Sequence, residues 1–322
     1  MAVIGVDLGG TKIAAAIYDQ FGNLVSKEYR LLNGAKGAEV GKVVTSVIGH
    51  LMENNPKYDI LGIGVCVPGI VYSKKGTVWA PNIPEWDNYP LKKELEDYIN
   101  NPSIKICIES DRTCYILGEV WKGAAQGCEN AIYMAVGTGI GAGIMIDGNI
   151  LHGASDIVGA TGWMALQYPY SEDYIQCGCY EYYASGNGIA TQARKALRCA
   201  QNYEYDGVMS GKPIDQITSH DVFAAYEQGD HIAVKVIYKA IEMWGMAAAN
   251  LVSLFNPEKL IFGGGVFGPA GKFLPRIYNV ARKWGQPIAM KEVEFCVSQI
   301  DGEAALLGAA YLAMRAVNPL NV

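Results

Sequence analysis

The sequence predicts an α/β protein with two domains built on one duplicated plan. Apolar strand-like runs alternate with segments of helical periodicity along the chain. The opening pattern of a strand, a glycine-rich reversal and a second strand returns near residue 130. A length of 322 residues also suits two domains. We therefore expect a β-β-β-α-β-α plan in each half, with a boundary near residue 118.

The first half is expected to open with two apolar strands within residues 3–18 and a third strand after the Gly22-Asn23 turn. Apolar residues at helical spacing predict a helix over 37–54. A buried strand follows and ends at Pro68-Gly69, and the stretch 78–91, rich in proline and aromatic residues, indicates an ordered loop. The remaining elements expected in this half are a helix over 91–99, a strand over 104–110 and a helix over 113–123.

The second half repeats the strand–turn–strand layout within residues 129–151. Helical patterns dominate from about 181 to 255, and the strand 259–267 leads into another helix. The chain then has a helix of small residues, 303–318, which we expect to dock on the N-terminal domain. The expected domains are thus 1–118 together with that helix, and 119–302.

The charge balance limits the classes of partner. The formal net charge is −6 and the pI is about 5.3, so nucleic acid, which needs a basic face, is not an expected partner. No apolar run of about 18 residues predicts a membrane span, and the N-terminus lacks a signal-peptide pattern. Eight scattered cysteines in a chain this long indicate reduced, mostly buried thiols and a cytoplasmic location.

The first candidate site is the reversal DLGGTK at residues 7–12. A carboxylate at the end of a strand, here Asp7, can hold a hydrated Mg²⁺. An ordinary hairpin that needs glycine for positive φ is the alternative. The pattern G-x-x-x-x-G-K-[ST] is absent, so the reversal is not a P-loop. The backbone amides, hydroxyl and amine that can form an anion-binding nest come from Gly9, Gly10, Thr11 and Lys12.

Two more glycine clusters occur in the second half. GTGIGAG at 137–143 is followed by a strand rather than a helix, which excludes a Rossmann fingerprint. Its Thr138 and glycine amides can take a phosphate, or the cluster is a crowded strand pair. GGGVF at 263–267 can lie against a nucleobase or ribose, or it is a tightly packed loop. Glycine turns in equivalent places of two halves predict a clamp on one polyphosphate.

Asp111 and the loop APNIPEW are candidates for the acceptor side. Asp111 follows a buried strand, where it can act as a general base for a hydroxyl or as a helix N-cap. Asn82 offers a donor and an acceptor to a vicinal diol, and Trp86 can stack on a sugar face. The alternative for this loop is rigid packing around Pro81 and Pro84.

Taken in order, these motifs resemble the ROK family of bacterial sugar kinases and related repressors. They are DLGGTK, VPGIV, APNIPEW, ESD, GTGIGAG, CYEYYASG and FGGGV, and together they span essentially the whole chain. The resemblance implies the actin-like ATPase fold, with two α/β domains around a cleft. It also implies ATP and Mg²⁺ as cofactors and phosphoryl transfer to a sugar hydroxyl. Repressor members carry an N-terminal helix-turn-helix, and we expect none here because DLGG starts at residue 7.

The resemblance further implies a role for each matching position. Asp111 matches the catalytic base, and Asp7 matches the position that holds Mg²⁺ through water. The positions for phosphate and adenosine are Asp7, Gly9, Gly10, Thr11, Lys12, Thr138, Gly139, Gly141, Gly264 and Gly265. The positions for the sugar are Gly69, Asn82, Ser110, Asp111, Trp163 and Glu181.

Several sugar and metal positions depart from the family pattern. The run E-N-D-A-N is here ESDRT, which places Ser110 where the family has Asn. The run G-E-I-G-H is here GATGW, so Ala160 replaces the sugar-binding Glu and Trp163 replaces the His that binds sugar and zinc. The cysteine cluster keeps only Gly178-Cys179, with Cys177 off register. We therefore expect no structural zinc, three fewer polar sugar contacts and one more aromatic face.

The sequence thus predicts an ATP-dependent kinase of a sugar or sugar-like polyol other than plain glucose, with Asp111 as general base. Each lost buried polar contact costs about 1–3 kcal/mol when the substrate still presents its hydroxyl, so three losses shift preference by orders of magnitude. A non-catalytic sugar or nucleotide sensor on the same scaffold is the alternative. From the family we also expect a homodimer.

Overall fold

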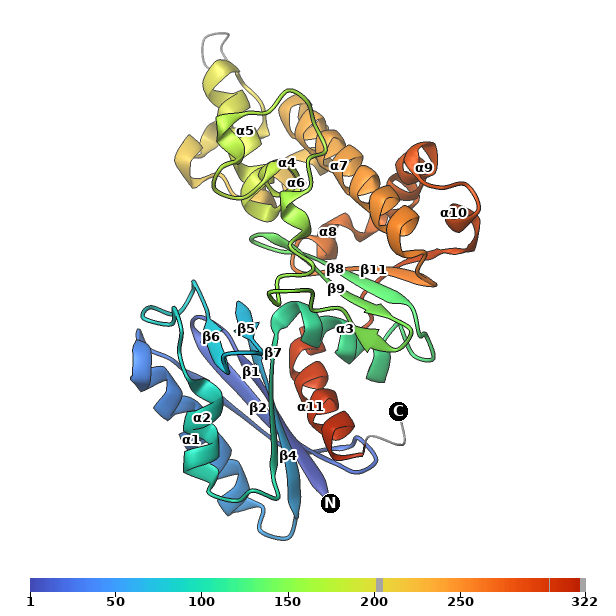
Figure 1. Ribbon diagram of the computed structural model, residues 1–322. Coiled ribbons are helices and arrows are strands. Elements are labelled where there is room, and N and C mark those ends of the chain that lie inside the picture. The colour runs from blue at the N-terminus through green and yellow to red at the C-terminus, as the bar shows by residue number, and fades with distance from the viewer. Residues whose placement is uncertain (201–204, 301, 319–322) are drawn as a thin grey trace. The chain divides into compact units, whose positions relative to one another are not determined.

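The computed structural model describes residues 1–200, 205–300 and 302–318, which fall into two α/β units (Figure 1). The expected boundary near residue 118 lies inside a helix of the first unit, and the chain first leaves that unit after Gly127. The expected helical region 181–255 includes residues 201–204, which lie outside the described residues. Unit 1 contains Met1–Gly127, Ile150–Val158 and Gln299–Val322, and unit 2 contains Cys128–Asn149 and Gly159–Ser298.

Within the described residues, two five-stranded sheets share one strand order. The first sheet has the order β3-β2-β1-β4-β7, and its strands are β1 (Ala2–Leu8), β2 (Lys12–Asp19), β3 (Leu24–Leu31), β4 (Ile60–Val67) and β7 (Lys105–Ser110). The second has the order β10-β9-β8-β11-β12, and its strands are β8 (Ala131–Val136), β9 (Ile140–Ile146), β10 (Asn149–Ile150), β11 (Lys259–Gly263) and β12 (Glu294–Val297). In both sheets the central strand pairs antiparallel with the strand that follows it and parallel with the next neighbour. The predicted α/β class and the duplicated plan are therefore confirmed.

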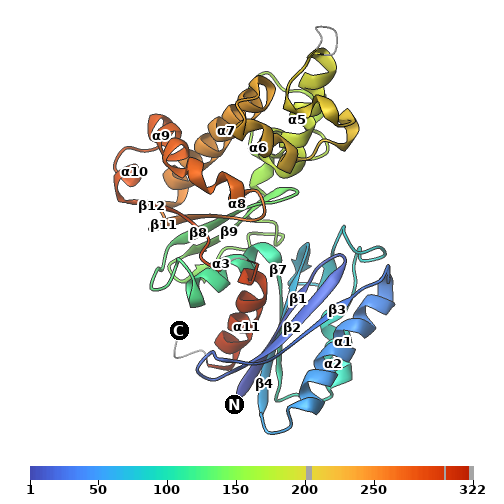
Figure 2. The same ribbon diagram turned by 180° about the vertical axis from the view of Figure 1, so that it is seen from behind.

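Helices lie on both faces of the first sheet (Figures 1 and 2). On one face, α1 (Gly37–Asn54) and α2 (Leu91–Ile99) cover a core that includes Ile4, Val6 and Leu8 of β1. On the other face lie α3 (Asp111–Lys122) and α11 (Ala304–Val317), against the alternate β1 residues. α11 packs so closely that a Cβ at Gly64 of β4 would lie 1.8 Å from the Ala309 carbonyl oxygen. Asp7, in phase with Val3, therefore faces the side of α3 and α11.

The helices of unit 2 gather around α7, whose Trp244 is fully buried. Its indole Nε1 donates to the Ala184 carbonyl at 3.0 Å, which ties α7 to α4. Figures 1 and 2 both place α7 and α9 over one face of the second sheet. The helices described in this unit are α4 (Cys179–Ala184), α5 (Gly186–Ala200), α6 (Ser219–Glu227), α7 (His231–Phe255), α8 (Phe267–Ala270), α9 (Leu274–Trp284) and α10 (Ala289–Glu292).

The loop expected over residues 78–91 begins with a short strand, β6 (Thr77–Trp79), which pairs antiparallel with β5 (Ile70–Tyr72). The rest of the stretch packs inward around Trp86, which is 1% exposed. Its Nε1 donates to the Gly37 carbonyl at 3.0 Å, and its ring stacks on Tyr89. Trp86 therefore belongs to the core and offers no face to a sugar, so the rigid-loop alternative describes this residue.

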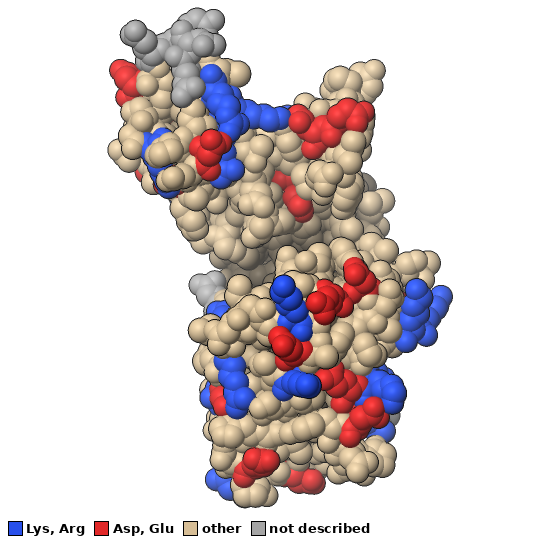
Figure 3. All heavy atoms as spheres, turned by 90° about the vertical axis from the view of Figure 1, so that its left-hand side faces the viewer, with Lys and Arg blue, Asp and Glu red and all other residues tan. Residues whose placement is uncertain are grey.

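Charged side chains of both signs lie on the surface. On the face shown in Figure 3, Lys and Arg side chains are interspersed with Asp and Glu side chains. No helix among the described residues is long and apolar enough to cross a membrane.

Candidate functional site

A row of polar side chains crosses the first sheet near the carboxyl ends of its parallel strands. Asp7 of β1 pairs in register with Cys66 of β4, and Cys66 pairs with Glu109 of β7. Partners on neighbouring parallel strands point to the same face, here the face of α3 and α11. The Cys66 thiol is buried and hydrogen-bonds the Asp7 carboxylate. The sheet thus places a carboxylate, a thiol and a second carboxylate side by side.

Asp7 is held in an unfavourable environment for its negative charge. Burial raises the pKa of Asp7 to about 6, and the charge of nearby Asp111 adds to the rise. The Cys66 hydrogen bond and the charge of Lys12 oppose this pKa shift. Asp7 and Asp111 are therefore close enough to repel each other, and a divalent cation would stabilise both ionised forms.

The donor set in unit 1 fits Mg²⁺ better than a metal enclosed by protein ligands. Among the described residues, no cluster of three or more His, Cys, Asp or Glu side chains has metal-binding geometry. Mg²⁺ usually keeps several waters and binds through one or two carboxylates together with substrate phosphates. Asp7, with its hard oxygen donors and raised pKa, satisfies that requirement.

The structure separates the two possible roles of Asp111. The N-cap of α3 is Ser110, whose Oγ accepts a hydrogen bond from the Thr113 amide at 3.4 Å. Asp111 is the first helical residue, and its Oδ1 accepts from the Arg112 amide at 2.8 Å. Burial raises the pKa of Asp111, while the Arg112 charge opposes the rise. Asp111 is thus not the cap, and a carboxylate with a raised pKa is suited to accept a proton.

Ser110 does not offer a free hydroxyl in this structure. It is buried, with a relative exposure of 8%. Its Oγ lies 3.2 Å from the Thr113 Oγ1, in addition to capping the Thr113 amide. Its predicted sugar contact therefore competes with the capping of α3.

The first glycine turn lies beside the loop that carries Asn82. The Gly9 amide donates to the Lys12 carbonyl at 2.9 Å, which closes the turn around exposed Thr11. A Cβ at Gly10 would lie 3.0 Å from the Asn82 carbonyl oxygen, and the Asn82 side chain is exposed. The phosphate turn and the predicted sugar residue Asn82 are thus neighbours.

Gly69 has a structural reason to lack a side chain. It lies just after β4, and a Cβ there would lie 2.0 Å from the Trp79 carbonyl oxygen of β6. The residues of unit 1 that the sequence predicts as a site therefore gather near the carboxyl ends of the parallel strands of its sheet. They are Asp7, Gly9, Gly10, Thr11, Lys12, Gly69, Asn82, Ser110 and Asp111.

The second glycine turn is tied to Glu181 of α4. The Ile140 amide donates to Glu181 Oε2 at 2.6 Å, and a Cβ at Gly139 would lie 2.8 Å from the same oxygen. Burial raises the pKa of Glu181, and the Ile140 hydrogen bond opposes the rise. Gly141 sits in β9 opposite Ala135. One predicted sugar residue, Glu181, thus contacts the predicted phosphate turn directly.

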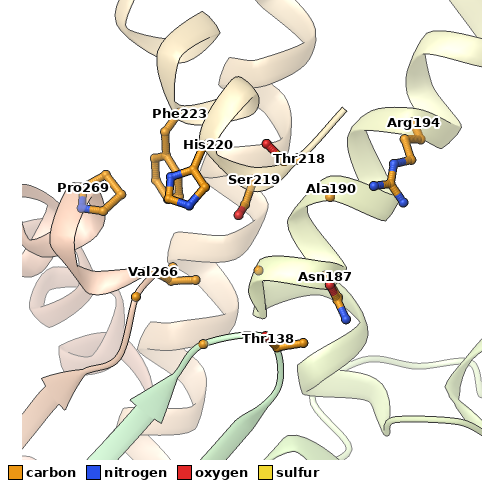
Figure 4. Close-up of a pocket in the computed structure, with 13 residues that line it drawn as sticks. Thr138, Asn187, Ala190, Arg194, Thr218, Ser219, His220, Phe223, Val266 and Pro269 are labelled. Atoms are coloured by element: carbon orange, nitrogen blue, oxygen red, sulfur yellow. The ribbon is translucent and has the colours of Figure 1, made fainter. Parts of the chain in front are cut away.

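A pocket of about 350 Å³ opens beside this turn, wholly within unit 2 (Figure 4). Thr138 lies at its base, and Gly265 lines it after β11. Gly264 adopts φ +87°, and a Cβ there would lie 2.6 Å from the Val136 carbonyl oxygen, so only glycine fits without strain. One predicted adenosine glycine, Gly265, and one predicted phosphate residue, Thr138, therefore line the same cavity.

Most of the remaining lining of this pocket lies outside the glycine clusters that the sequence singled out. The other lining residues come largely from α5, from α6 with the residue before it, and from the segment after β11, as Figure 4 shows. They include two basic side chains and one aromatic ring and no Asp or Glu; the residues are Gly137, Gly186, Asn187, Ala190, Arg194, Thr218, Ser219, His220, Phe223, Val266 and Pro269. Arg194 is held by a hydrogen bond from its Nε to the Ile217 carbonyl at 2.8 Å. These helical positions carry no motif that sequence inspection would single out.

Trp163 closes a short 3-10 helix, Thr161–Trp163, and is 58% exposed. Its ring is therefore available to a ligand. Cys179 is buried at the start of α4, and the Cys177 thiol donates to the Gly178 carbonyl at 3.8 Å. This region therefore presents an exposed aromatic side chain at Trp163 and a buried thiol at Cys179.

Comparisons with known proteins match this chain to one protein family over most of its length. The model of the ROK family matches residues 3–316. A glucokinase of Halalkalibacterium halodurans is 32% identical over 333 residues, covering 98% of this chain and 96% of the relative. A xylose repressor of Caldicellulosiruptor bescii is 29% identical over 314 residues, covering 95% of this chain and 76% of the repressor.

Solved structures of ROK proteins are also similar to this chain. A ROK hexokinase from Thermus thermophilus has a TM-score of 0.82 at 28% identity, covering 99% of this chain and 100% of that one. A ROK family glucokinase from Streptomyces griseus, in complex with glucose and AMPPNP, has a TM-score of 0.73 at 28% identity, covering 98% and 100%. The predicted actin-like ATPase fold is confirmed by these likenesses.

Proposed function

This chain belongs to the ROK family, and we propose that it is an ATP-dependent kinase that phosphorylates a hydroxyl of a sugar or sugar-like compound. The family contains named glucokinases and a named repressor among the relatives, so membership alone does not choose between catalysis and sensing. The choice rests on the charged groups of unit 1.

The observation that carries the proposal is the pair of interacting acids Asp7 and Asp111 near the carboxyl ends of β1 and β7. Neither is needed to cap α3, since Ser110 does so. Two carboxylates that raise each other's energy are costly to the folded protein, and they persist where chemistry requires them. Phosphoryl transfer requires one acid to hold a cation and another to take a proton.

The proposed mechanism assigns a task to each group in unit 1. Asp111 accepts the proton of the acceptor hydroxyl, and its raised pKa brings its basicity closer to neutral pH. The amides of Gly10 and Thr11 in the first turn hold phosphate oxygens, and the Lys12 amine neutralises charge there. Asp7 would hold Mg²⁺, which when bound supplies neutralisation of charge on the phosphate oxygens. Catalysis of this kind is mostly positioning and charge neutralisation.

The pocket of unit 2 supports nucleotide binding. It combines an aromatic ring, Phe223, with polar groups, the Arg194 guanidinium and the His220 imidazole, and no carboxylate lines it. A base can lie between apolar and aromatic walls while amides and cations meet anionic oxygens. Among the compared structures, the Streptomyces griseus glucokinase holds AMPPNP. We infer ATP as the phosphoryl donor.

We propose an acceptor other than plain glucose. Position 160 is alanine and position 163 is an exposed tryptophan, and the Ser110 hydroxyl is engaged in capping. A pocket with fewer polar partners disfavours a sugar that presents all of its hydroxyls. A flat aromatic face favours an apolar substituent or an altered carbon on the acceptor.

The test is a transfer assay on the purified chain with Mg-ATP and a panel of glucose, mannose, xylose, N-acetylmannosamine, glycerol and aryl β-glucosides. We expect transfer to at least one acceptor, with glucose not preferred. The variant Asp111→Asn should lose about 10²–10⁴-fold in kcat, because an amide cannot take the proton. Absence of turnover above that variant for every acceptor would remove the kinase proposal.

The second candidate is a sensor that binds sugar or nucleotide without transfer, and the altered positions Ala160 and Trp163 favour it. Thermal shifts with Mg-ATP and with each sugar, run beside the transfer assay, separate the two candidates. A sugar-induced shift without transfer supports the sensor. We also propose that the protein acts in the cytoplasm as a homodimer, which light scattering of the purified chain tests.

A further inference from the structure

Unit 1 holds a histidine–carboxylate pair that the proposed reaction does not use. His152 Nε2 lies 2.8 Å from Glu109 Oε1. The two residues are 43 positions apart in the chain. Glu109 is the penultimate residue of β7 and leads through the Ser110 cap to Asp111. The pair therefore stands two residues from the proposed base.

His152 belongs to a short segment, Ile150–Val158, that groups with unit 1 although the residues on either side of it belong to unit 2. Among the described residues, two sets of side-chain hydrogen bonds join this segment to the rest of unit 1. One is the pair with Glu109, and the other is Asp156, whose carboxylate accepts from the Ser73 amide at 3.0 Å and from its Oγ at 3.0 Å. The segment then passes directly to Gly159 and the altered stretch GATGW.

The β7 strand lies at the side of its sheet. In the described sheet β7 is the edge strand, so only β4 holds its backbone by ladder hydrogen bonds. An edge strand has one side without a sheet partner. A side-chain anchor at Glu109 therefore restrains the strand near the place where Asp111 begins α3.

The charges around His152 favour its protonated form. The hydrogen bond with Glu109 raises the pKa of His152, and burial opposes it. The charges of Glu109 from β7 and Asp156 from its own segment, with a backbone hydrogen bond at Ile150, raise the pKa further. An imidazolium at this place balances the negative charge of Glu109, two residues before Asp111.

We propose that His152 is a positioning residue of the acceptor site, whose ion pair with Glu109 holds the β7–α3 junction, and hence Asp111, in place for proton acceptance. This inference rests on the proposed kinase function, since Asp111 has this task only there. The two side chains are 42% and 19% exposed, and exposed pairs contribute little to global stability. The expected effect is therefore on geometry at Asp111 rather than on folding.

The chain offers a matched control. His50 Nδ1 lies 2.8 Å from Glu28 Oε1, with side-chain exposures of 51% and 23%, and this pair joins α1 to β3 in the same unit. The test compares His152→Gln, Glu109→Gln, their double variant and His152→Arg with His50→Gln. Each is assayed for kcat and KM with Mg-ATP and the best acceptor of the panel, across about pH 6 to pH 9. Hydrogen exchange of Ile150–Val158 is measured without any acceptor.

We expect His152→Gln and Glu109→Gln each to lower kcat about tenfold, since small displacements of a catalytic group are costly. The double variant should be no worse than either single variant, because both remove one interaction. The KM for ATP should stay within about twofold, since the nucleotide pocket lies in unit 2. Wild-type kcat should fall as pH rises through the pKa of His152, and His152→Arg, with its permanent cation, should not show that fall.

A His152→Gln enzyme with the kcat and pH profile of His50→Gln would overturn the inference. Additive losses in the double variant would also overturn it. An inactive wild type would remove the proposed function and, with it, the catalytic task of His152. In that case faster exchange of Ile150–Val158 in His152→Gln than in His50→Gln still shows the anchor, and equal exchange removes that as well.

Discussion

The two glycine turns occupy the same place in two sheets of the same strand order, yet their surroundings differ in charge. The first turn, at Gly9 and Gly10, lies between ionisable groups, with Asp7 before it and Lys12 at its end. The second, at Gly137 to Gly139, borders a pocket lined by polar, aromatic and basic residues without a carboxylate.

The acids beside the two turns, Asp7 and Glu181, also differ in what their carboxylates contact. Asp7 has its carboxylate beside a second acid, Asp111, and its pKa is raised to about 6. Glu181 turns its carboxylate onto the backbone amide of Ile140 in the second turn. A duplicated backbone can therefore supply anion-binding amides twice, and under the proposed function the side chains decide which copy supports proton and cation chemistry and which supports nucleotide binding.

The largest expected effect comes from removing the charge of Asp7. The variant Asp7→Asn should lose about 10³-fold in kcat, because it no longer holds the cation that neutralises phosphate charge. It should also be more stable above about pH 6, by ~3 kcal/mol, since the wild type must ionise a buried acid there. The measurements are kcat and the free energy of unfolding in urea.

The sign of this pH effect follows from the direction of the shift. A folded pKa above the unfolded value means that the folded wild type binds protons more tightly, so its unfolding free energy falls as pH rises from about 4 to about 6 and then levels off. The asparagine variant lacks this fall. A stability difference that is the same at about pH 4 and about pH 8 would contradict the assignment of strain to Asp7.

The second prediction separates folding from binding at two adjacent glycines of unit 2. Gly264→Ala should destabilise the protein by about 2–3 kcal/mol, because φ is +87° and the new Cβ meets the Val136 carbonyl oxygen. Gly265→Ala meets nothing within 4 Å and should change stability by less than about 0.5 kcal/mol.

Gly265 lines the pocket, so its alanine variant should raise the KM for ATP while leaving the melting temperature unchanged. Calorimetry and nucleotide titration of the two variants give both quantities. Equal stability of the two variants would refute the role of the positive φ at Gly264.

Much of this arrangement could be predicted from the sequence, because it depends on local pattern. The helices α1 and α2 begin and end where the apolar spacing places them, at Gly37–Asn54 and Leu91–Ile99. The repeated strand–turn–strand layout predicted a duplicated plan, and the matching strand orders agree with it. Hydrophobic periodicity and glycine turns are short-range signals, and they survive into the folded structure.

The parts that escaped prediction depend on contacts distant in sequence. Trp86 was open to a sugar-stacking role until its Nε1 was seen to donate to Gly37, 49 residues away. The cap of α3 differs by one residue from the alternative considered, Ser110 instead of Asp111, and both residue types are good caps. The partner of His152 lies 43 residues away. Tertiary packing, which no local pattern encodes, settles such cases.

A third prediction concerns the pocket residues that the sequence did not indicate. His220→Ala should weaken AMPPNP binding about five- to tenfold, because the imidazole forms part of the pocket wall shown in Figure 4. The KM for the acceptor should not change. His231→Ala, at the start of α7 and outside the pocket lining, is the control. Titration calorimetry with AMPPNP measures both, and equal weakening in the two variants would show an indirect effect on folding.

The smallest effect is expected at Glu181, and it tests whether this acid serves the turn or the sugar. In Glu181→Gln the amide oxygen can still accept the Ile140 N–H, so the bond at 2.6 Å becomes neutral rather than lost. Because burial raises the pKa of Glu181, the wild type loses stability as pH rises through that pKa, and the glutamine variant does not. The gain in stability should therefore be present at about pH 8 and absent at about pH 4, and it should be smaller than that of Asp7→Asn.

Kinetics of the same variant then assign the role of Glu181. If its carboxylate only fixes the second turn, the KM for ATP should rise no more than about threefold and the acceptor KM should not move. If it also contacts the sugar, as the family pattern implies, the acceptor KM should rise more than the ATP KM. An acceptor effect would show that unit 2 also contributes to sugar recognition, and the two glycine turns would then not be divided between nucleotide and sugar.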